Sequence, residues 1–198
     1  MTLHTMGDSH CDVTFTGIPN VSVHRIGPVT LRRVSHPDDT LLPNAVATLN
    51  LAPNNTLLLC FGEIDVRCWI QPSLARRKDG NLHNMLAEWA KAYLDRIQTL
   101  PTQAKIAVLG ITPPAPMIRI VQSTEFTVRG SDQERILWTT ALNTTLAKEC
   151  AQRNIPLVDL SPIAGPGGML PLNRSDGQHH ALCPTLVSEA LAKAGIPA

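Results

Sequence analysis

The sequence predicts an α/β fold, a three-layer doubly wound sandwich around a mostly parallel central sheet. Two continuous apolar runs, residues 56–61 and 104–111, have the composition of strands that are buried on both faces, as parallel strands are. Segments of helical periodicity alternate with these runs, which is typical of crossover connections with helices on both faces of a sheet. The 198 residues, 43% of them hydrophobic, suit a single domain spanning residues 1–198.

The expected strands follow one another along the chain. A short apolar segment, residues 3–6, forms the first strand, and residues 21–25 form the second. Residues 56–61 and 104–111 are the central strands, each stopped by glycine or proline residues. Residues 155–160 form the last strand. We therefore expect the residues that directly follow these strands to meet at one edge of the sheet.

The expected helices separate these strands. Residues 82–97 carry apolar side chains at the i, i+3, i+4, i+7 spacing of an amphipathic helix. Residues 132–153 form a second long helix, with polar residues in its first turn. Residues 184–194 form a closing helix with proline at its start, and residues 42–51 form a helix in a less regular region. Each helix is long enough to cross back over the sheet.

Composition excludes several classes of function. The formal net charge is +1 and no basic run is present, so nucleic acid is not an expected partner. No apolar run approaches the roughly 20 residues needed to span a bilayer, and no secretory leader is visible, so a cytoplasmic protein is expected. The five cysteines have no metal-like spacing and are expected to be buried, reduced thiols. We predict no metal and no cofactor.

The side chains that could take part in catalysis follow predicted strands. Ser9 follows the first strand, Asp65 follows the strand at residues 56–61, and Asp176 and His179 lie in a long glycine- and proline-rich loop after the last strand. A serine hydroxyl needs a base to accept its proton, and a histidine oriented by a carboxylate can serve. A loop of this length in a compact domain is usually functional or disordered. We expect a serine nucleophile, with His179 as base and Asp176 as its partner.

In the order of these residues the chain resembles the SGNH (GDSL-like) hydrolases. Residues 7–10, Gly-Asp-Ser-His, look like the first block of that family, and residues 176–179, Asp-Gly-Gln-His, look like its last. Residues 62–65, Gly-Glu-Ile-Asp, fall where the family carries Gly-x-Asn-Asp. The resemblance covers nearly the whole chain and implies an SGNH or flavodoxin-like sandwich. It also implies a catalytic triad of Ser9, Asp176 and His179.

The closest similarity is to a subgroup with Phe-Gly-Glu-Ile-Asp-x-Arg at the third block, here residues 61–67, and with Arg135 and Asn143 on a later helix. One departure concerns the oxyanion hole, the set of donors that stabilises the negative charge on the substrate oxygen. The family uses the Asn side chain of its third block, and Ile64 stands at that position. The remaining candidates are the Ser9 backbone N–H, Gly27 and the Arg67 side chain. The alternative for Arg67 is a structural ion pair with Asp65 or Glu63.

Four further residues are candidates for contact with the substrate: Asp8, His10, Asp65 and His180. Asp8 and His10 flank the nucleophile, and the alternative is that they bond the backbone of their own turn, as Asp residues often do. His180 neighbours the predicted base. We expect these residues to line the site around Ser9.

The sequence thus predicts an acyl-transfer enzyme that acts through a Ser9 acyl-enzyme. It would be an esterase of an acylated carbohydrate or small ester, or an acyltransferase from an acyl donor to a sugar hydroxyl. A different class, a two-metal phosphoesterase, would use Asp8, His10, Asp65 and His179 as ligands. A third, a noncatalytic carbohydrate-binding relative, is suggested only by Ile64. The oligomeric state stays open.

Overall fold

In a computed structural model the central sheet has five strands, all parallel, in the order β2-β1-β3-β4-β5. The model describes residues 2–120, 124–165, 167–170 and 183–196. The strands are β1 (Leu3–Gly7), β2 (Val21–Arg25), β3 (Thr56–Cys60), β4 (Lys105–Leu109) and β5 (Leu157–Val158). The predicted fold class, a doubly wound sandwich with a mostly parallel sheet, is confirmed.

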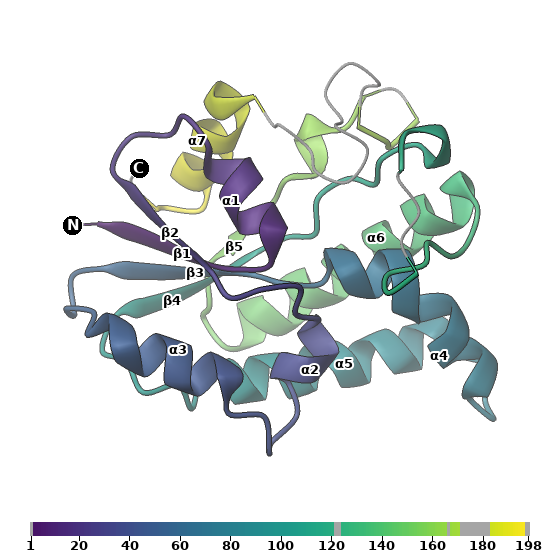
Figure 1. The fold of residues 1–198 in the computed structure, drawn as a ribbon, viewed down its shortest axis with the longest axis horizontal. Coiled ribbons are helices and arrows are strands. Elements are labelled where there is room, and N and C mark those ends of the chain that lie inside the picture. Colours follow the sequence, from purple (N-terminus) through teal and green to yellow (C-terminus); the bar gives the residue numbers. More distant parts are fainter. Residues whose placement is uncertain (1, 121–123, 166, 171–182, 197–198) are drawn as a thin grey trace.

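Helices cover both faces of this sheet (Figure 1). One face carries α1 (Ser9–Phe15) and α7 (Pro184–Lys193). The other face carries α2 (Leu31–Val34), α3 (Leu41–Leu49), α5 (Leu82–Ile97) and α6 (Asp132–Gln152). A π-helical turn (Asp65–Trp69) leads directly into α4 (Ile70–Arg76), and short 3-10 turns occupy Met117–Arg119 and Ser161–Ile163. Among the described residues, no helix is both long and apolar enough to cross a bilayer.

The alternation of side chains along β3 explains why its sequence is apolar throughout. Leu57 and Leu59 join the core on the face of α2, α3, α5 and α6, whereas Leu58 and Cys60 join the core under α1 and α7. Every residue of β3 is buried, because helices cover the strand on both sides. The apolar runs are therefore typical of a sheet that lies between two layers of helices.

Gly7 ends β1 at a point where the backbones of β1 and β3 approach closely. A Cβ atom at this position would collide with the carbonyl oxygen and the side chain of Cys60. Only glycine fits there, so β1 can turn immediately into the residues that carry Ser9. The first motif of the sequence is thus fixed to the middle of the sheet.

Some element boundaries differ from the sequence-based expectations for identifiable reasons. The loop expected to hold Ser9 is the first turn of α1, because Asp8 caps that helix. The strand expected at residues 104–111 ends at Leu109, because the backbone of Ile111 bonds the Asn143 side chain and leaves the ladder. The strand expected at residues 155–160 is only β5, because the Ile155 N–H bonds the end of α6.

The five cysteines form no disulfide with one another, as expected for reduced thiols. The four that are buried are Cys11, Cys60, Cys68 and Cys150. Cys183 is partly exposed, so the expectation of burial holds for the other four only. Burial raises the pKa of Cys11 to about 12 and that of Cys150 to about 11, which keeps both thiols protonated near neutral pH.

Candidate active site

Ser9 lies at the carboxyl end of β1, the strand that pairs with both β2 and β3. It is the first residue of α1 and is half-buried. Neither its hydroxyl nor its backbone N–H hydrogen bonds to any described residue. The hydroxyl and the amide are therefore both available to a ligand, and they come from one residue at the start of a helix.

His10 forms a buried ionic network directly behind this serine. Its Nδ1 lies 3.0 Å from Asp8 Oδ1, and its Nε2 lies 3.5 Å from Glu63 Oε2. Burial by itself lowers the pKa of His10, but Glu63 and Asp8 outweigh it and raise the pKa to about 9. His10 is therefore an imidazolium at neutral pH, held between the turns after β1 and β3.

Arg67 extends the network on the far side of Glu63. Its Nε donates to Glu63 Oε1 at 2.8 Å and to Oε2 at 3.2 Å. The sequence left open an ion pair of Arg67 with Asp65 or with Glu63, and the structure shows the pair with Glu63. The two terminal nitrogens of Arg67 make no hydrogen bond within the described part of the chain. Glu63 thus fixes the guanidinium without using all its donors.

Asp65 serves a different purpose from the one expected. Its side chain is completely buried and accepts hydrogen bonds from the backbone N–H groups of Leu31 (2.6 Å) and Arg32 (3.3 Å). These are the first N–H groups of α2, which have no partner inside the helix. Burial raises the pKa of Asp65 to about 7, against the lowering effect of these two bonds. Asp65 was expected to contact the substrate, but in the structure it has no exposed surface and caps α2.

The remaining oxyanion candidates lie near the same edge of the sheet. Gly27 follows β2, has φ of 102°, and has open space where a side chain would be. Ile64, which occupies the position of the family's Asn, is buried in the core at 2% exposure. The oxyanion candidates that remain are the backbone amides of Ser9 and Gly27 and the Arg67 guanidinium, whereas the Ile64 side chain has no donor. Asp176, His179 and His180 lie outside the described residues.

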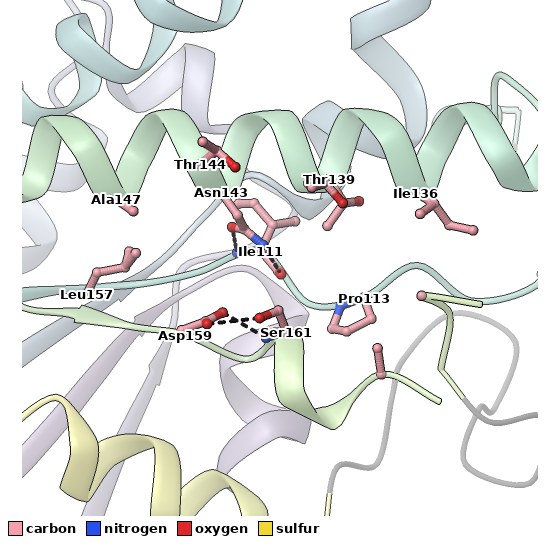
Figure 2. A pocket seen from close by; sticks show the side chains of 13 residues that line it. Ile111, Pro113, Ile136, Thr139, Asn143, Thr144, Ala147, Leu157, Asp159 and Ser161 are labelled. Carbon is pink, nitrogen blue, oxygen red and sulfur yellow. Dashed lines mark hydrogen bonds between the residues drawn. The ribbon is translucent and has the colours of Figure 1, made fainter. Parts of the chain in front are cut away.

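A pocket of about 320 Å³ opens between α6 and the segments that follow β4 and β5 (Figure 2). Ile111, Pro113 and Leu157 form part of its wall, and Thr139 faces it from α6. The Thr139 hydroxyl is buried and has no hydrogen-bond partner among the described residues. Ile111 also borders a small cavity beside Asp8 and His10. The pocket therefore lies at the same edge of the sheet as Ser9.

Two side chains of α6 fix the wall of this pocket. Asn143 accepts from the Ile111 N–H at 2.7 Å and donates to the Ile111 carbonyl at 2.9 Å. Arg135 is buried, donates to the Ala115 carbonyl at 2.7 Å and pairs with Asp132. These two residues carried part of the family resemblance. In the structure they anchor the backbone that follows β4.

Sequence reasoning missed the polar stripe of α6 and the link between His10 and Glu63. Thr139 and Asn143 are four residues apart beside the apolar stripe of the helix, and this spacing was a usable signal. The contact between His10 and Glu63 joins residues 53 positions apart and leaves no such signal. Among the described residues, no group of three or more His, Cys, Asp or Glu side chains is arranged to hold a metal ion.

Comparison with known proteins establishes the fold. An aryl esterase from M. smegmatis in an inhibitor-bound form has a TM-score of 0.58 at 18% identity, covering 98% of this chain and 97% of the other. Axe2, an acetylxylan esterase from Geobacillus stearothermophilus studied as a catalytic mutant, has a TM-score of 0.56 at 13% identity, covering 98% and 94%. A member of the lipolytic protein G-D-S-L family from Veillonella parvula has a TM-score of 0.50 at 14% identity, covering 98% and 97%.

No family model and no curated protein matches the sequence. At these identities the three structures are evidence for a shared fold over nearly the whole chain, and fold does not determine activity. The chain therefore has the α/β sandwich that these ester-cleaving proteins use, and its function has to be argued from the site.

Proposed function

We propose that the protein is a serine ester hydrolase of the SGNH type, in which Ser9 forms an acyl-enzyme. The position of Ser9 carries the proposal: its hydroxyl and backbone amide bond none of the described residues, and it lies at the carboxyl end of a central strand in a fold shared with esterases. Neutral serine is a weak nucleophile, so a base is required. His179, oriented by Asp176, is the proposed base.

In this reaction the Ser9 oxygen attacks the ester carbonyl carbon while its proton passes to His179. The negative charge on the carbonyl oxygen is met by the Ser9 N–H, by Gly27 and by the free nitrogens of Arg67, in place of the missing Asn side chain. The proton on His179 then leaves with the alcohol. Water, or a sugar hydroxyl in the acyltransferase version, attacks the acyl-enzyme and restores Ser9. The pocket beside Ile111 is the proposed place for one half of the ester.

Active-site labelling tests this proposal. Incubation with a fluorophosphonate, followed by peptide mass spectrometry, should place the label on Ser9. The variant Ser22→Ala, which removes a half-buried serine from β2, should label normally, whereas Ser9→Ala should not label. Ester hydrolysis that resists a strong chelator would further favour the serine mechanism over the two-metal alternative. Absence of label from Ser9, with a control esterase labelled in the same tube, would falsify the proposal.

A further inference from the structure

A second depression, formed by α2, α4 and residues 125–126, has a volume of about 760 Å³. Its lining includes Arg32, Arg33 and Arg76, together with Trp69 and Phe126. We call it the α2–α4 groove. Neither the proposed hydrolysis nor the pocket beside Ile111 uses any of these residues.

Arg32 lines this groove, and its guanidinium contacts two uncharged residues that lie outside the groove lining. Its Nη1 donates to the Ser73 hydroxyl at 3.1 Å, and its guanidinium carbon lies 4.9 Å from the centre of the Trp89 ring. Asp65 bonds the backbone N–H of Arg32, and no described carboxylate forms an ion pair with its guanidinium. A stacked arginine that no carboxylate neutralises is suited to bidentate binding of a phosphate or carboxylate.

Arg76 also lines the groove. Ser73 and Arg76 are three residues apart on α4, so they share one face of the helix, and Arg32 bonds the first of them. Arg76 is exposed and forms no hydrogen bond or ion pair with the described residues. The neighbouring Arg77 differs, because Asp79 and Glu88 both pair with it. Arg32 and Arg76 are therefore two groove residues that form no ion pair with the described residues.

The groove is also lined by three acidic residues, and none of them forms an ion pair with Arg32 or Arg76. Asp39 pairs with Arg33 at 3.0 Å and also accepts from the Leu41 N–H. Asp38 is highly exposed and lies 3.8 Å from His36. Glu125 also lines the groove and has contacts of its own. With the Arg33–Asp39 pair set aside, Arg32 and Arg76 are the donors available to an incoming anion.

The groove begins beside the turn that carries Ser9. The Ile26 N–H donates to the Gly7 carbonyl at 2.9 Å, which places the end of β2 against the start of the Gly7–Ser9 turn. Pro28 and Thr30, only a few residues further, already line the groove. We propose that the α2–α4 groove binds a phosphate or carboxylate group of the ester on which Ser9 acts, an assignment that rests on the proposed function.

Calorimetric titration with sodium phosphate tests the anion site without any catalysis. The ionic strength is held constant with sodium chloride, because salt screens such interactions. We expect Arg32→Gln and Arg76→Gln to weaken phosphate binding at least tenfold. Lys193→Gln, which removes an exposed charge from α7 on the opposite face of the sheet, should bind phosphate normally. Melting temperatures of all variants establish that they are folded.

The absence of phosphate binding, or equal binding by all four proteins, would overturn the anion site. A parallel titration with sodium succinate shows whether a carboxylate is preferred to a phosphate. Equal loss of both in Arg76→Gln supports a general oxyanion site, and loss of one alone identifies the group that the groove recognises.

A matched pair of substrates tests the connection with Ser9. The 4-nitrophenyl esters of butyric acid and of succinic acid have the same leaving group and similar acyl length, but only the succinate carries a second carboxylate. We expect Arg76→Gln to lower the succinate-to-butyrate ratio of kcat/KM at least fivefold. An unchanged ratio would overturn the assignment to the substrate. Arginine-dependent phosphate binding in a protein that cleaves neither ester would instead overturn the proposed hydrolysis.

Discussion

Asp8 and Asp65 lie in the turns that follow the neighbouring strands β1 and β3, and both carboxylates are almost completely buried. Asp65 accepts only backbone N–H groups, from Leu31 and Arg32 at the start of a helix that is distant in the sequence. Asp8 caps its own helix through the His10 N–H and also holds the His10 ring. One carboxylate joins two parts of the fold, and the other fixes a charge behind the nucleophile.

Asp65 and His10, the buried titratable groups of the two turns, differ in protonation because their neighbours differ. Within the described part of the chain Asp65 forms no ion pair, so burial outweighs its hydrogen bonds and the charge of Arg32 and raises its pKa to about 7, which favours the neutral acid below that pH. In the β1 turn, Glu63 and Asp8 overcome the effect of burial and raise the pKa of His10 to about 9. A buried carboxyl group without an ion-pair partner favours its neutral form, whereas a buried histidine between carboxylates keeps its proton and its positive charge. The comparison predicts catalytic effects at Ser9 and Arg67, one in each turn, and pH-dependent stability effects at the buried groups Asp65 and His10.

The largest effect is expected from Ser9→Ala. Removing the proposed nucleophile should lower kcat for a 4-nitrophenyl ester about a thousandfold or more, because no acyl-enzyme can form. The melting temperature should change little, since the Ser9 side chain makes no hydrogen bond to the described residues. Initial rates and melting curves measure both quantities. Near-normal turnover in this variant would remove the β1 turn from the catalytic site.

Arg67→Ala should have the next largest effect. If Arg67 stabilises the oxyanion, kcat should fall about a hundredfold, as when one such donor is removed. The conservative Arg67→Lys retains the charge but loses the forked geometry, so it should recover only part of the rate. Turnover and melting temperature are measured on the same preparations. A large fall in melting temperature with intact turnover would show that Arg67 only braces Glu63.

Asp65→Asn sharpens the comparison through the dependence of stability on pH. Between about pH 4 and pH 7 the folded protein keeps the Asp65 proton that the unfolded chain has lost, so the free energy of unfolding should decrease as the pH rises. The variant cannot titrate and should lack this decrease, which we expect to be about 4 kcal/mol. Urea unfolding at several pH values gives the two curves. Parallel curves would show that Asp65 is ionised in the folded state throughout.

The smallest effect is expected from His10→Gln, in a different pH window. The folded protein holds the imidazolium proton that the unfolded chain loses near pH 6.5, so His10 contributes stability below that pH. This contribution, about 3 kcal/mol, should disappear as the pH rises through about 9. His36→Gln, a change at an exposed histidine, is the matched control. Urea unfolding at several pH values measures this effect as well. If the unfolding free energy of His10→Gln depends on pH as that of the wild type does, His10 is not a buried imidazolium.

The sequence determined the layers of the fold, because burial leaves a local record. A strand covered on both faces must be apolar throughout, as β3 is, and an amphipathic helix must repeat its apolar residues every turn, as α5 does. These patterns were sufficient to predict the strand and helix segments at the level of fold class. The order of Ser9, Asp176 and His179 likewise allowed a chemical hypothesis, and the roles of these three residues are still predictions.

Only the tertiary structure decided what the polar residues of the two turns do. The partners of Asp65 are 33 and 34 residues away, and Glu63 lies 53 positions from His10. Such contacts join segments through the folded sheet and impose no period on the sequence. The start of α1 at Ser9 is a similar case, because seven residues rarely form a stable helix without a cap and a packed face. Local burial can be read from the sequence, whereas pairing across the fold has to be seen in the structure.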